Sequence, residues 1–545
     1  MSGERSYSGL RFWSLFLAGL SFVDLALLLV VVVLHAAEPM NVEVALLYPL
    51  FYIFGGSVIS SVVLGAFWFV LRYPNHRKTL LVLALITTGL VIAHFYTINS
   101  PPTASCYDSN TTPNVDGCVM DEIYYVPAAQ ALLSGAKCGP YVNNCNFEHP
   151  FLSKAIIAAG IVLFGNNDFG WRFFVVVMGV ACIPILFAIC WRISRDSTLS
   201  LFAAFLLAFE TLFFVHSSIA VIDVQPVFFA LLAFLVYLSD FRLWRLNSFT
   251  LAGILLGLSA LSKETALFLV LFLVAYNAVL GTGTRRFRLL TSLEIFIVTT
   301  VVFAAGLQIY ATLFGNSSVH TFLDEVHYIL SYGSSLKGVG WTDAVFGTPI
   351  TPLNWMTYYS AVGYFVTRVL VNGVPEYVAL GYWGTPNFFE IWLTYLWAPY
   401  VVFLGYKRWR ARRSAPAADA PVAPATDLSF DDAPVIAEQE VTTGRAEESP
   451  PSPDPSLKLA GFALLWFAFT YFPYFAIYIY GRVTYPFYLI PAIPAIAIGC
   501  AYVLSRRWFP REVAYILLGG VFLWFFLYYP DKSFLPTWLR IILGH

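Results

Sequence analysis

The sequence predicts an all-α fold, a polytopic bundle of transmembrane helices, on two main observations. The chain of 545 residues is 59% hydrophobic and only 12% charged, whereas soluble domains carry about a quarter charged residues. Long apolar runs also recur along the chain, and each run of about 20 residues needs a bilayer around it. The net charge of −1 and the lack of a long basic stripe in the sequence argue against a nucleic-acid-binding protein.

The apolar runs predict about thirteen membrane spans, connected on the outer side by loops that carry short amphipathic helices. The first run is too long for the apolar region of a signal peptide and lacks a small-residue cleavage site, so it is interpreted as a helix. The expected spans are 12–34, 45–71, 79–98, 172–191, 198–215, 224–239, 249–262, 264–281, 290–311, 388–406, 459–480, 483–504 and 513–529.

Basic residues predict the orientation of these spans. Clusters such as Arg285, Arg286 and Arg288 all fall on one side of the membrane, and the positive-inside rule makes that side the cytoplasm. The other side then carries the long polar loops 99–171 and 312–387. We expect an integral, multi-pass protein of a prokaryotic plasma membrane, with its active site on the extracytoplasmic face.

Composition divides the chain into three parts. Residues 1–413 form the expected transmembrane catalytic region, and residues 458–545 form C-terminal transmembrane helices. Residues 414–457 between them are rich in Pro, Ala, Asp and Glu and contain almost no aromatic residues. Such a segment cannot bury enough apolar area to offset the entropy of ordering. It is predicted to be a disordered cytoplasmic linker, with a partner-binding tail as the alternative.

Four of the seven cysteines lie in the first outer loop: Cys106, Cys118, Cys138 and Cys145. An oxidising compartment favours disulfides in such a loop. We favour the local pairs Cys106–Cys118 and Cys138–Cys145 among the three possible pairings. Zinc binding is the alternative, but the close Cys-x-x-Cys pairs of structural zinc sites are missing from the loop.

Charged residues gather in short segments at the predicted outer membrane boundary. Charged groups there are costly unless they face water, a ligand or each other. The segments are Asp121-Glu122, His149 through Lys154, Arg172, His216 through Asp223, Lys263-Glu264 and Gly481-Arg482.

Each segment also has a purely structural interpretation. Asp121 and Glu122 suit a helix N-cap or a solvated pair. Lys154 and Arg172 suit side chains that reach towards lipid headgroups, and His149 suits a hydrogen-bonded interfacial histidine.

The Lys263-Glu264 dipeptide interrupts one long apolar stretch. A buried ion pair between the two residues is one interpretation. A broken helix with charges at its break, which is how membrane proteins build ligand sites, is the other.

Taken in order, these segments resemble the dolichyl-phosphate-mannose–protein mannosyltransferase family, one of the GT-C membrane glycosyltransferases. Asp121-Glu122 matches the family's Asp-Glu at the start of its first lumenal loop. His149-Pro150-Phe151-Leu152-Ser153-Lys154 resembles its His-Pro-Pro-Leu-Gly-Lys motif, and Arg172 opens a segment similar to the hydrophobic one that follows there.

The resemblance continues towards the C-terminus. His216 through Asp223 is similar to the family's Gln-Ser-Arg-x-x-x-x-Asp turn, and Gly257 through Lys263 resembles its Gly-Leu-x-x-x-x-Lys pattern. Arg482 through Pro494 is similar to its C-terminal Arg followed by Pro-Ala-x-Pro. The likeness covers about residues 121–281 and, more weakly, 482–500.

The chain also departs from the family pattern. Ser218 stands where the family has Arg, and Pro486-Phe487-Tyr488 stands where it has Tyr-His-Tyr. Three predicted spans precede the Asp-Glu loop, whereas family members usually have one. The MIR repeats of eukaryotic members are not recognisable in the sequence, which indicates a prokaryotic relative.

The resemblance implies transfer of a sugar, mannose, from a dolichyl- or polyprenyl-phosphate donor to a Ser or Thr hydroxyl of an exported protein, with inversion. Asp121, by its match to the family's Asp, is the candidate base for the acceptor hydroxyl, and Glu122 would assist binding. Cations near the interface would stabilise the departing phosphate: Arg172, Lys154, Arg482 or Lys263. The further site candidates are His149, Asp223, Lys263 and Glu264.

This chemistry requires no cofactor; an Asp-Glu pair can bind a divalent metal, but the reaction does not need one. One alternative is transfer of a polyprenyl-phosphate sugar to a lipid or glycan acceptor. Another is a secondary transporter, although paired inverted halves with matching broken helices are not visible in the sequence.

Overall fold

The computed structural model describes residues 74–101, 119–134, 145–239, 246–316, 318–336, 351–357, 362–371, 374–379, 382–414 and 454–529, with a few single residues before them. The predicted spans 12–34 and 45–71 lie almost wholly outside these residues, as do Cys106, Cys118, Cys138 and nearly all of the predicted linker 414–457. Cys145 is disulfide-bonded, but the cysteine with which it pairs lies outside the described residues, so the pairing stays a prediction.

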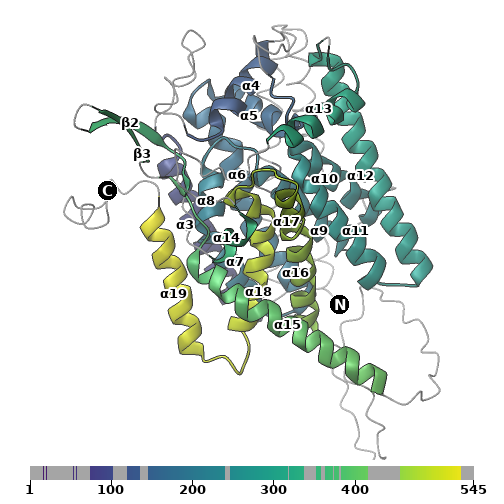
Figure 1. The fold of residues 1–545 in the computed structure, drawn as a ribbon. Helices are drawn as coiled ribbons and strands as arrows, with labels where there is room; N and C mark the ends of the chain where they lie inside the picture. The colour runs from purple at the N-terminus through teal and green to yellow at the C-terminus, as the bar shows by residue number, and fades with distance from the viewer. Residues whose placement is uncertain are drawn as a thin grey trace, which may run out of the picture.

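The described chain is a bundle of α-helices (Figure 1). Seven helices are long and apolar enough to cross a membrane, or eight if a bent pair counts as one span. The bundle is therefore that of an integral membrane protein. Its helices are η1 (Pro74–His76), α3 (Arg77–Thr97), α4 (Glu122–Ser134), α5 (Leu152–Phe164), α6 (Asp168–Ser194), α7 (Ser197–Ala208), α8 (Thr211–Ser218), α9 (Val224–Tyr237), α10 (Ser248–Ser262), η3 (Glu264–Ala266), α11 (Leu267–Leu280), α12 (Arg285–Phe314), α13 (Phe322–Ser335), α14 (Pro352–Thr357), α15 (Phe388–Ser414), α16 (Pro455–Tyr471), α17 (Pro473–Ile479), η4 (Pro486–Ala492), α18 (Ile493–Leu504) and α19 (Arg511–Tyr528).

Polar residues at helix starts explain several boundaries within this apolar chain. The Asn167 side chain accepts a hydrogen bond from Gly170 N at 3.0 Å and caps α6. Asp196 caps α7 and Asn247 caps α10 in the same way. Each cap satisfies a backbone N–H that has no partner in the first helical turn.

The predicted span 198–215 corresponds to a bent pair of helices. Helices α7 and α8 meet there at an angle of 58°. Glu210 lies at the break, where its side chain accepts a hydrogen bond from Phe213 N at 2.6 Å and caps α8. A carboxylate that binds backbone N–H groups ends one helix and begins the next.

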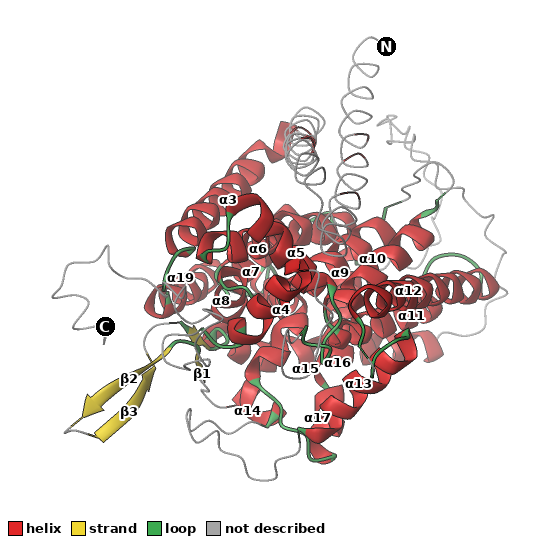
Figure 2. Cartoon of the chain, turned by 90° about the horizontal axis from the view of Figure 1, so that it is seen from above, coloured by secondary structure: helices red, strands yellow, loops and turns green. Residues whose placement is uncertain are grey.

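The all-α prediction is also incomplete, because the described part of the predicted outer loop 312–387 contains four short strands. β1 (Val362–Gly363) pairs antiparallel with β4 (Trp383–Gly384). β2 (Val366–Val371) pairs antiparallel with β3 (Val374–Ala379), and this hairpin projects from the bundle (Figures 1 and 2). An Asn-Gly dipeptide between two Val-rich segments is a hairpin signal, so this element could have been read from the sequence.

Glycines allow close approach of the helices that carry the site. A Cβ on Gly257 of α10 would lie 2.6 Å from the Val302 side chain of α12, and a Cβ on Gly160 of α5 would lie 2.1 Å from Gly170 O of α6. Neither position has room for a side chain. The packed helices present α4, α5 and α13 together at one end of the bundle (Figure 1).

Candidate active site

Asp121 lies directly before α4, half-buried. The charged groups that most affect its carboxyl are Lys263, Asp223, His149 and His216. Burial raises the pKa of Asp121, and the positive charge of Lys263 opposes that rise. Residues from four of the predicted segments therefore meet around one acid. Within the described residues, no side chain donates a hydrogen bond to the Asp121 carboxylate.

Asp223 connects two of these segments. Its Oδ1 accepts a hydrogen bond from Lys263 Nζ at 2.5 Å, and its Oδ2 lies 3.1 Å from His216 Nδ1. Burial alone would raise the pKa of Asp223, but Lys263 and His216 outweigh burial and hold this pKa well below its usual range. Asp223 is therefore a permanently ionised group that fixes the position of Lys263.

The helix break at Lys263-Glu264 is confirmed, but the two residues do not pair with each other. Lys263 contacts Asp223, whereas Glu264 Oε2 lies 2.8 Å from His149 Nδ1. Lys263 Nζ also lies 5.5 Å from the ring centre of Phe487, a cation–π distance. The break thus directs two opposite charges to two different partners.

Glu122 and Arg172 form a buried pair that joins α4 to α6. Arg172 Nε and Nη2 donate hydrogen bonds to the two Glu122 oxygens at 2.8 and 2.9 Å, and neither side chain is exposed. Arg172 also donates to Ile98 O at 2.9 Å, and Glu122 accepts from Ala220 N at 2.6 Å. Both residues that the sequence suggested for chemistry are fully occupied by protein groups.

Lys154 is likewise enclosed. Its Nζ donates hydrogen bonds to the carbonyl oxygens of Cys145 at 3.1 Å, His149 at 2.7 Å, and Asn146. The residue has no exposed surface. Lys154 therefore holds the segment that leads into α5, and in this arrangement it does not face a ligand.

Arg482 differs from Arg172 and Lys154, two of the other cations that are predicted to bind the phosphate. It follows Gly481, whose φ of 84° suits glycine in a tight turn. Its Nε is buried without a hydrogen-bond partner, and no carboxylate of the described residues pairs with the guanidinium. Arg482 acts electrostatically on Tyr474 and Tyr488, and Tyr488 is also affected by Asp121 and Lys263. Arg482 is thus an unpaired cation beside the acid cluster.

Sequence reasoning missed two residues that contact the predicted segments, Tyr364 and His94. The Tyr364 hydroxyl lies 2.7 Å from His216 Nε2, although Tyr364 belongs to an outer loop without a recognisable motif. Ser218, where the family has Arg, has its hydroxyl 2.9 Å from Nδ1 of the buried His94 of α3. Contacts between such distant segments leave no periodic signal in a single sequence.

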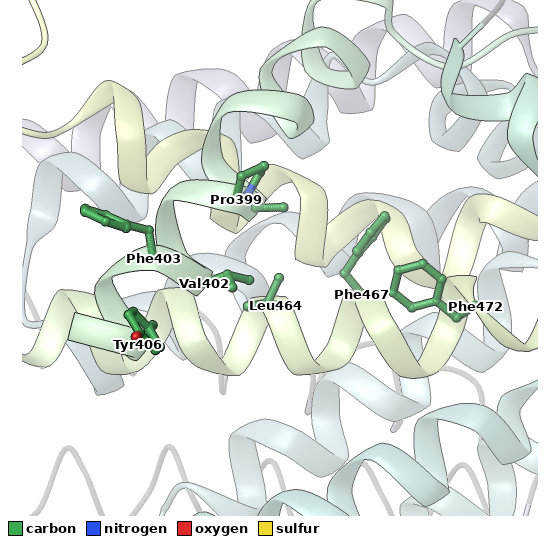
Figure 3. Close-up of a pocket in the computed structure, with 8 residues that line it drawn as sticks. Pro399, Val402, Phe403, Tyr406, Leu464, Phe467 and Phe472 are labelled. Atoms are coloured by element: carbon green, nitrogen blue, oxygen red, sulfur yellow. The ribbon is translucent and has the colours of Figure 1, made fainter. Parts of the chain in front are cut away.

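An apolar groove of about 510 Å³ lies between α15 and α16 (Figure 3). It shares no residue with the polar cluster. Its lining consists of Ala398, Pro399, Val402, Phe403, Tyr406, Leu464, Phe467 and Phe472. Its walls suit a hydrocarbon chain.

Within the described part of the chain, no group of three or more His, Cys, Asp or Glu residues is arranged to hold a metal ion.

Comparison with known proteins bears out the resemblance. Residues 148–310 match the model of the dolichyl-phosphate-mannose-protein mannosyltransferase family. A polyprenol-phosphate-mannose–protein mannosyltransferase of Mycolicibacterium smegmatis is 30% identical over 230 residues, which cover 37% of this chain and 42% of the relative. An undecaprenyl phosphate-alpha-4-amino-4-deoxy-L-arabinose arabinosyl transferase of Pseudomonas paraeruginosa is 31% identical over 182 residues, covering 31% of this chain and 32% of the relative. The chain thus matches less than half of the length of these relatives.

The fold has a solved counterpart. A structure of the S. cerevisiae protein O-mannosyltransferase Pmt1-Pmt2 complex bound to the sugar donor superposes with a TM-score of 0.58 at 10% sequence identity. The match covers 83% of this chain and 90% of that chain. At this identity the comparison shows a shared fold.

Proposed function

This chain is a relative of the dolichyl-phosphate-mannose-protein mannosyltransferases, and from that premise we propose that it transfers mannose from a polyprenyl-phosphate donor to a Ser or Thr hydroxyl of an exported protein. One observation carries the proposal. A half-buried acid, Asp121, and a cation, Arg482, share an electrostatic cluster, and neither side chain has a hydrogen-bond or ion-pair partner among the residues that the structure describes. An acid for the acceptor and a cation for the phosphate are the two groups that this reaction needs.

The proposed reaction is a single displacement. Asp121 takes the proton of the acceptor hydroxyl while the hydroxyl oxygen bonds to the anomeric carbon. The bond from that carbon to the phosphate oxygen breaks, and its electron pair leaves with the lipid phosphate. Arg482 and Lys263 stabilise the charge that develops on the phosphate. Attack opposite the leaving group inverts the anomeric carbon through an oxocarbenium-like transition state.

The remaining polar residues support these groups in our proposal. Glu122 and Arg172 hold α4 against α6, and Lys154 holds the segment before α5. Asp223 keeps Lys263 in place, and the His149–Glu264 pair lines the same cluster. The groove between α15 and α16 receives part of the polyprenyl tail, because its lining is apolar.

We also propose the wider arrangement that the sequence predicts. The protein has about thirteen spans, its active site faces the extracytoplasmic side, and residues 414–457 separate the catalytic region from the C-terminal helices. Positive clusters at the opposite side support this orientation.

The similarity to an arabinosyl transferase that is named for an undecaprenyl phosphate sugar supports a second candidate. In that case the same site transfers a sugar from a polyprenyl phosphate to a lipid or glycan acceptor. The donor chemistry is unchanged, and only the acceptor differs.

The test is transfer of labelled mannose from polyprenyl phosphate by membranes that contain the protein. Asp121→Asn should lower the transfer rate by roughly 10²- to 10⁴-fold, the usual contribution of a general base. Asp454→Asn is the matched control, because Asp454 caps α16 and Asn caps helices equally well.

Equal rates for wild type and Asp121→Asn would remove Asp121 from the proposed role. Label that enters lipid or glycan but no Ser- or Thr-containing peptide would favour the second candidate.

A further inference from the structure

Tyr364, from the outer loop 312–387, contacts the chain beside the candidate base. Its carbonyl oxygen accepts a hydrogen bond from Met120 N at 2.8 Å, and Val119 forms a β-bridge with Phe365. Met120 has a φ of 40°, which an L-residue adopts only where its surroundings impose it. The backbone of Tyr364 therefore fixes the turn that directly precedes Asp121.

The side chain of Tyr364 begins a continuous line of polar contacts. Its hydroxyl lies 2.7 Å from His216 Nε2, and His216 Nδ1 lies 3.1 Å from Asp223 Oδ2. Asp223 Oδ1 accepts from Lys263 Nζ at 2.5 Å. Tyr364 is only 2% exposed, and His216 is fully buried. The line thus runs from the outer loop to a cation of the proposed phosphate site without bulk water.

Each hydrogen bond along this line has a defined donor and a defined acceptor. An ionised Asp223 can only accept hydrogen bonds, so Nδ1 of His216 must donate to it. In the neutral imidazole, Nε2 then has a lone pair and accepts from the Tyr364 hydroxyl. Burial, followed by Asp223 and Asp121, raises the pKa of Tyr364 well above its usual value, so the phenol keeps its proton. Asp223 therefore selects the Nδ1–H tautomer of His216, and the Tyr364 hydroxyl holds the free Nε2 in place.

Gly384 restricts the position of the Tyr364 phenol. A Cβ on this residue would lie 2.0 Å from the Tyr364 hydroxyl oxygen, so no larger residue fits there without displacing the ring. Gly384 belongs to β4, which pairs with β1 directly before Tyr364. The short sheet in the outer loop thus places this one hydroxyl.

We propose that Tyr364 is a positioning residue of the transferase, which orients His216 and Asp223 through its phenol and Asp121 through its backbone. This inference rests on the proposed function. Tyr364 acts through His216, so it needs no contact with the reacting atoms. Through these contacts, the outer loop sets the position of Asp121, the proposed base, relative to Lys263, the cation of the proposed phosphate site.

The first test is Tyr364→Phe, which keeps the ring and removes the hydroxyl. We expect kcat to fall about tenfold, the size of a lost hydrogen bond to a buried group, while KM for the donor stays within about twofold. Tyr529→Phe is the control, because it removes a phenol that donates to Ala93 O at 2.7 Å and lies outside the proposed site. An unchanged kcat in Tyr364→Phe would overturn the inference.

Gly384→Ala provides a second variant that retains the hydroxyl but displaces the ring. Like Tyr364→Phe, Gly384→Ala should lower kcat. Wild-type kcat in Gly384→Ala would contradict the placement of the phenol.

A readout that does not depend on transfer separates this inference from the proposed function. In protein with ¹⁵N-labelled histidine, the His216 signal, assigned with His216→Gln, should show the proton on Nδ1 in the wild type. Tyr364→Phe should keep this tautomer but shift the Nε2 signal, because that nitrogen loses its hydrogen-bond donor, and Tyr529→Phe should leave the signal unchanged. If the Nε2 signal shifts but the wild type transfers no sugar, the proposed function fails and the positioning role of Tyr364 for His216 stands. An unchanged Nε2 signal in Tyr364→Phe refutes the inference.

Discussion

Asp121 and Arg482 differ from the other charged residues of the cluster because neither has a partner among the described residues. Arg172, Lys154 and Lys263 all have protein groups within hydrogen-bond distance. A partly buried cation such as Arg482 that meets no protein anion is costly, so a ligand that supplies the anion is favoured there. In the proposed function, Asp121 and Arg482 are therefore the two residues whose polar groups are free to meet a ligand.

The guanidinium of Arg482 should determine donor affinity. We expect Arg482→Gln to raise KM for polyprenyl-phosphate mannose about tenfold, because a charge-assisted contact to phosphate is lost. Arg482→Lys should recover part of this loss, since it restores the charge without the planar fork. Steady-state kinetics with varied donor measure both effects. Arg511→Gln, at the start of α19, is the control, and an unchanged KM in Arg482→Gln would exclude phosphate binding by this residue.

The pH dependence of the rate should report Asp121. A general base must be ionised, so kcat should fall as the pH drops through the pKa of this residue. Burial raises that pKa, which places the acid limb above the ordinary aspartate value of about 3.9. Rates measured across pH, after a check that the protein recovers full activity at neutral pH, test this. An acid limb at or below the ordinary value would contradict the assignment.

The sequence predicted those site residues whose motifs follow the same order as in the family. Asp121, Asp223 and Lys263 were identified by resemblance and do converge. The pairing of Glu122 with Arg172 was not predictable, because it depends on how α4 packs against α6. Tyr364 carried no signal, since it reaches His216 through a fold contact alone.

At the scale of single elements, the Glu122–Arg172 pair is the main polar link between α4 and α6. Removing Glu122 leaves Arg172 buried with one more distant carboxylate among the described residues, Asp168, whose Oδ1 lies 3.7 Å from Nη2. Glu122→Gln should therefore destabilise the protein by about 3–5 kcal/mol, seen as a lower midpoint of thermal unfolding in detergent. The double variant Glu122→Met/Arg172→Met should recover much of that loss.

Glu512→Gln on the exposed start of α19 is the control for this pair. Equal stability of the single and double variants would show that the pair contributes no coupling.

Helices were predictable because hydropathy is a local property, and most predicted spans have a helical counterpart. The bend between α7 and α8 was missed because one carboxylate, Glu210, overrides the apolar pattern around it. The strands of the outer loop were missed although their Val-rich segments flank an Asn-Gly turn. Propensity alone does not locate such small sheets in a helical protein.

At the scale of the whole molecule, α4 and α5, which the segments with Asp121 and His149 precede, lie at one end of the bundle (Figure 1). If that end is extracytoplasmic, Ser331→Cys on α13 should react with a membrane-impermeant maleimide in intact cells, beyond the wild-type background. Arg286→Cys, near the start of α12, should react only after lysis. Labelling of both variants in intact cells, or the reverse pattern, would contradict the proposed orientation.

Asp121 and Arg482 lie far apart in the sequence, so the ribosome adds Asp121 long before Arg482. Chains are made and inserted from the N-terminus, so a nascent chain that has reached Ser414 already contains Asp121. It does not yet contain α17, η4 or Arg482, which follow α16. A partly made protein in the bilayer thus carries the acid without the cation that would hold a lipid phosphate. The proposed donor site therefore forms only after the segment that carries Arg482 has left the ribosome and docked.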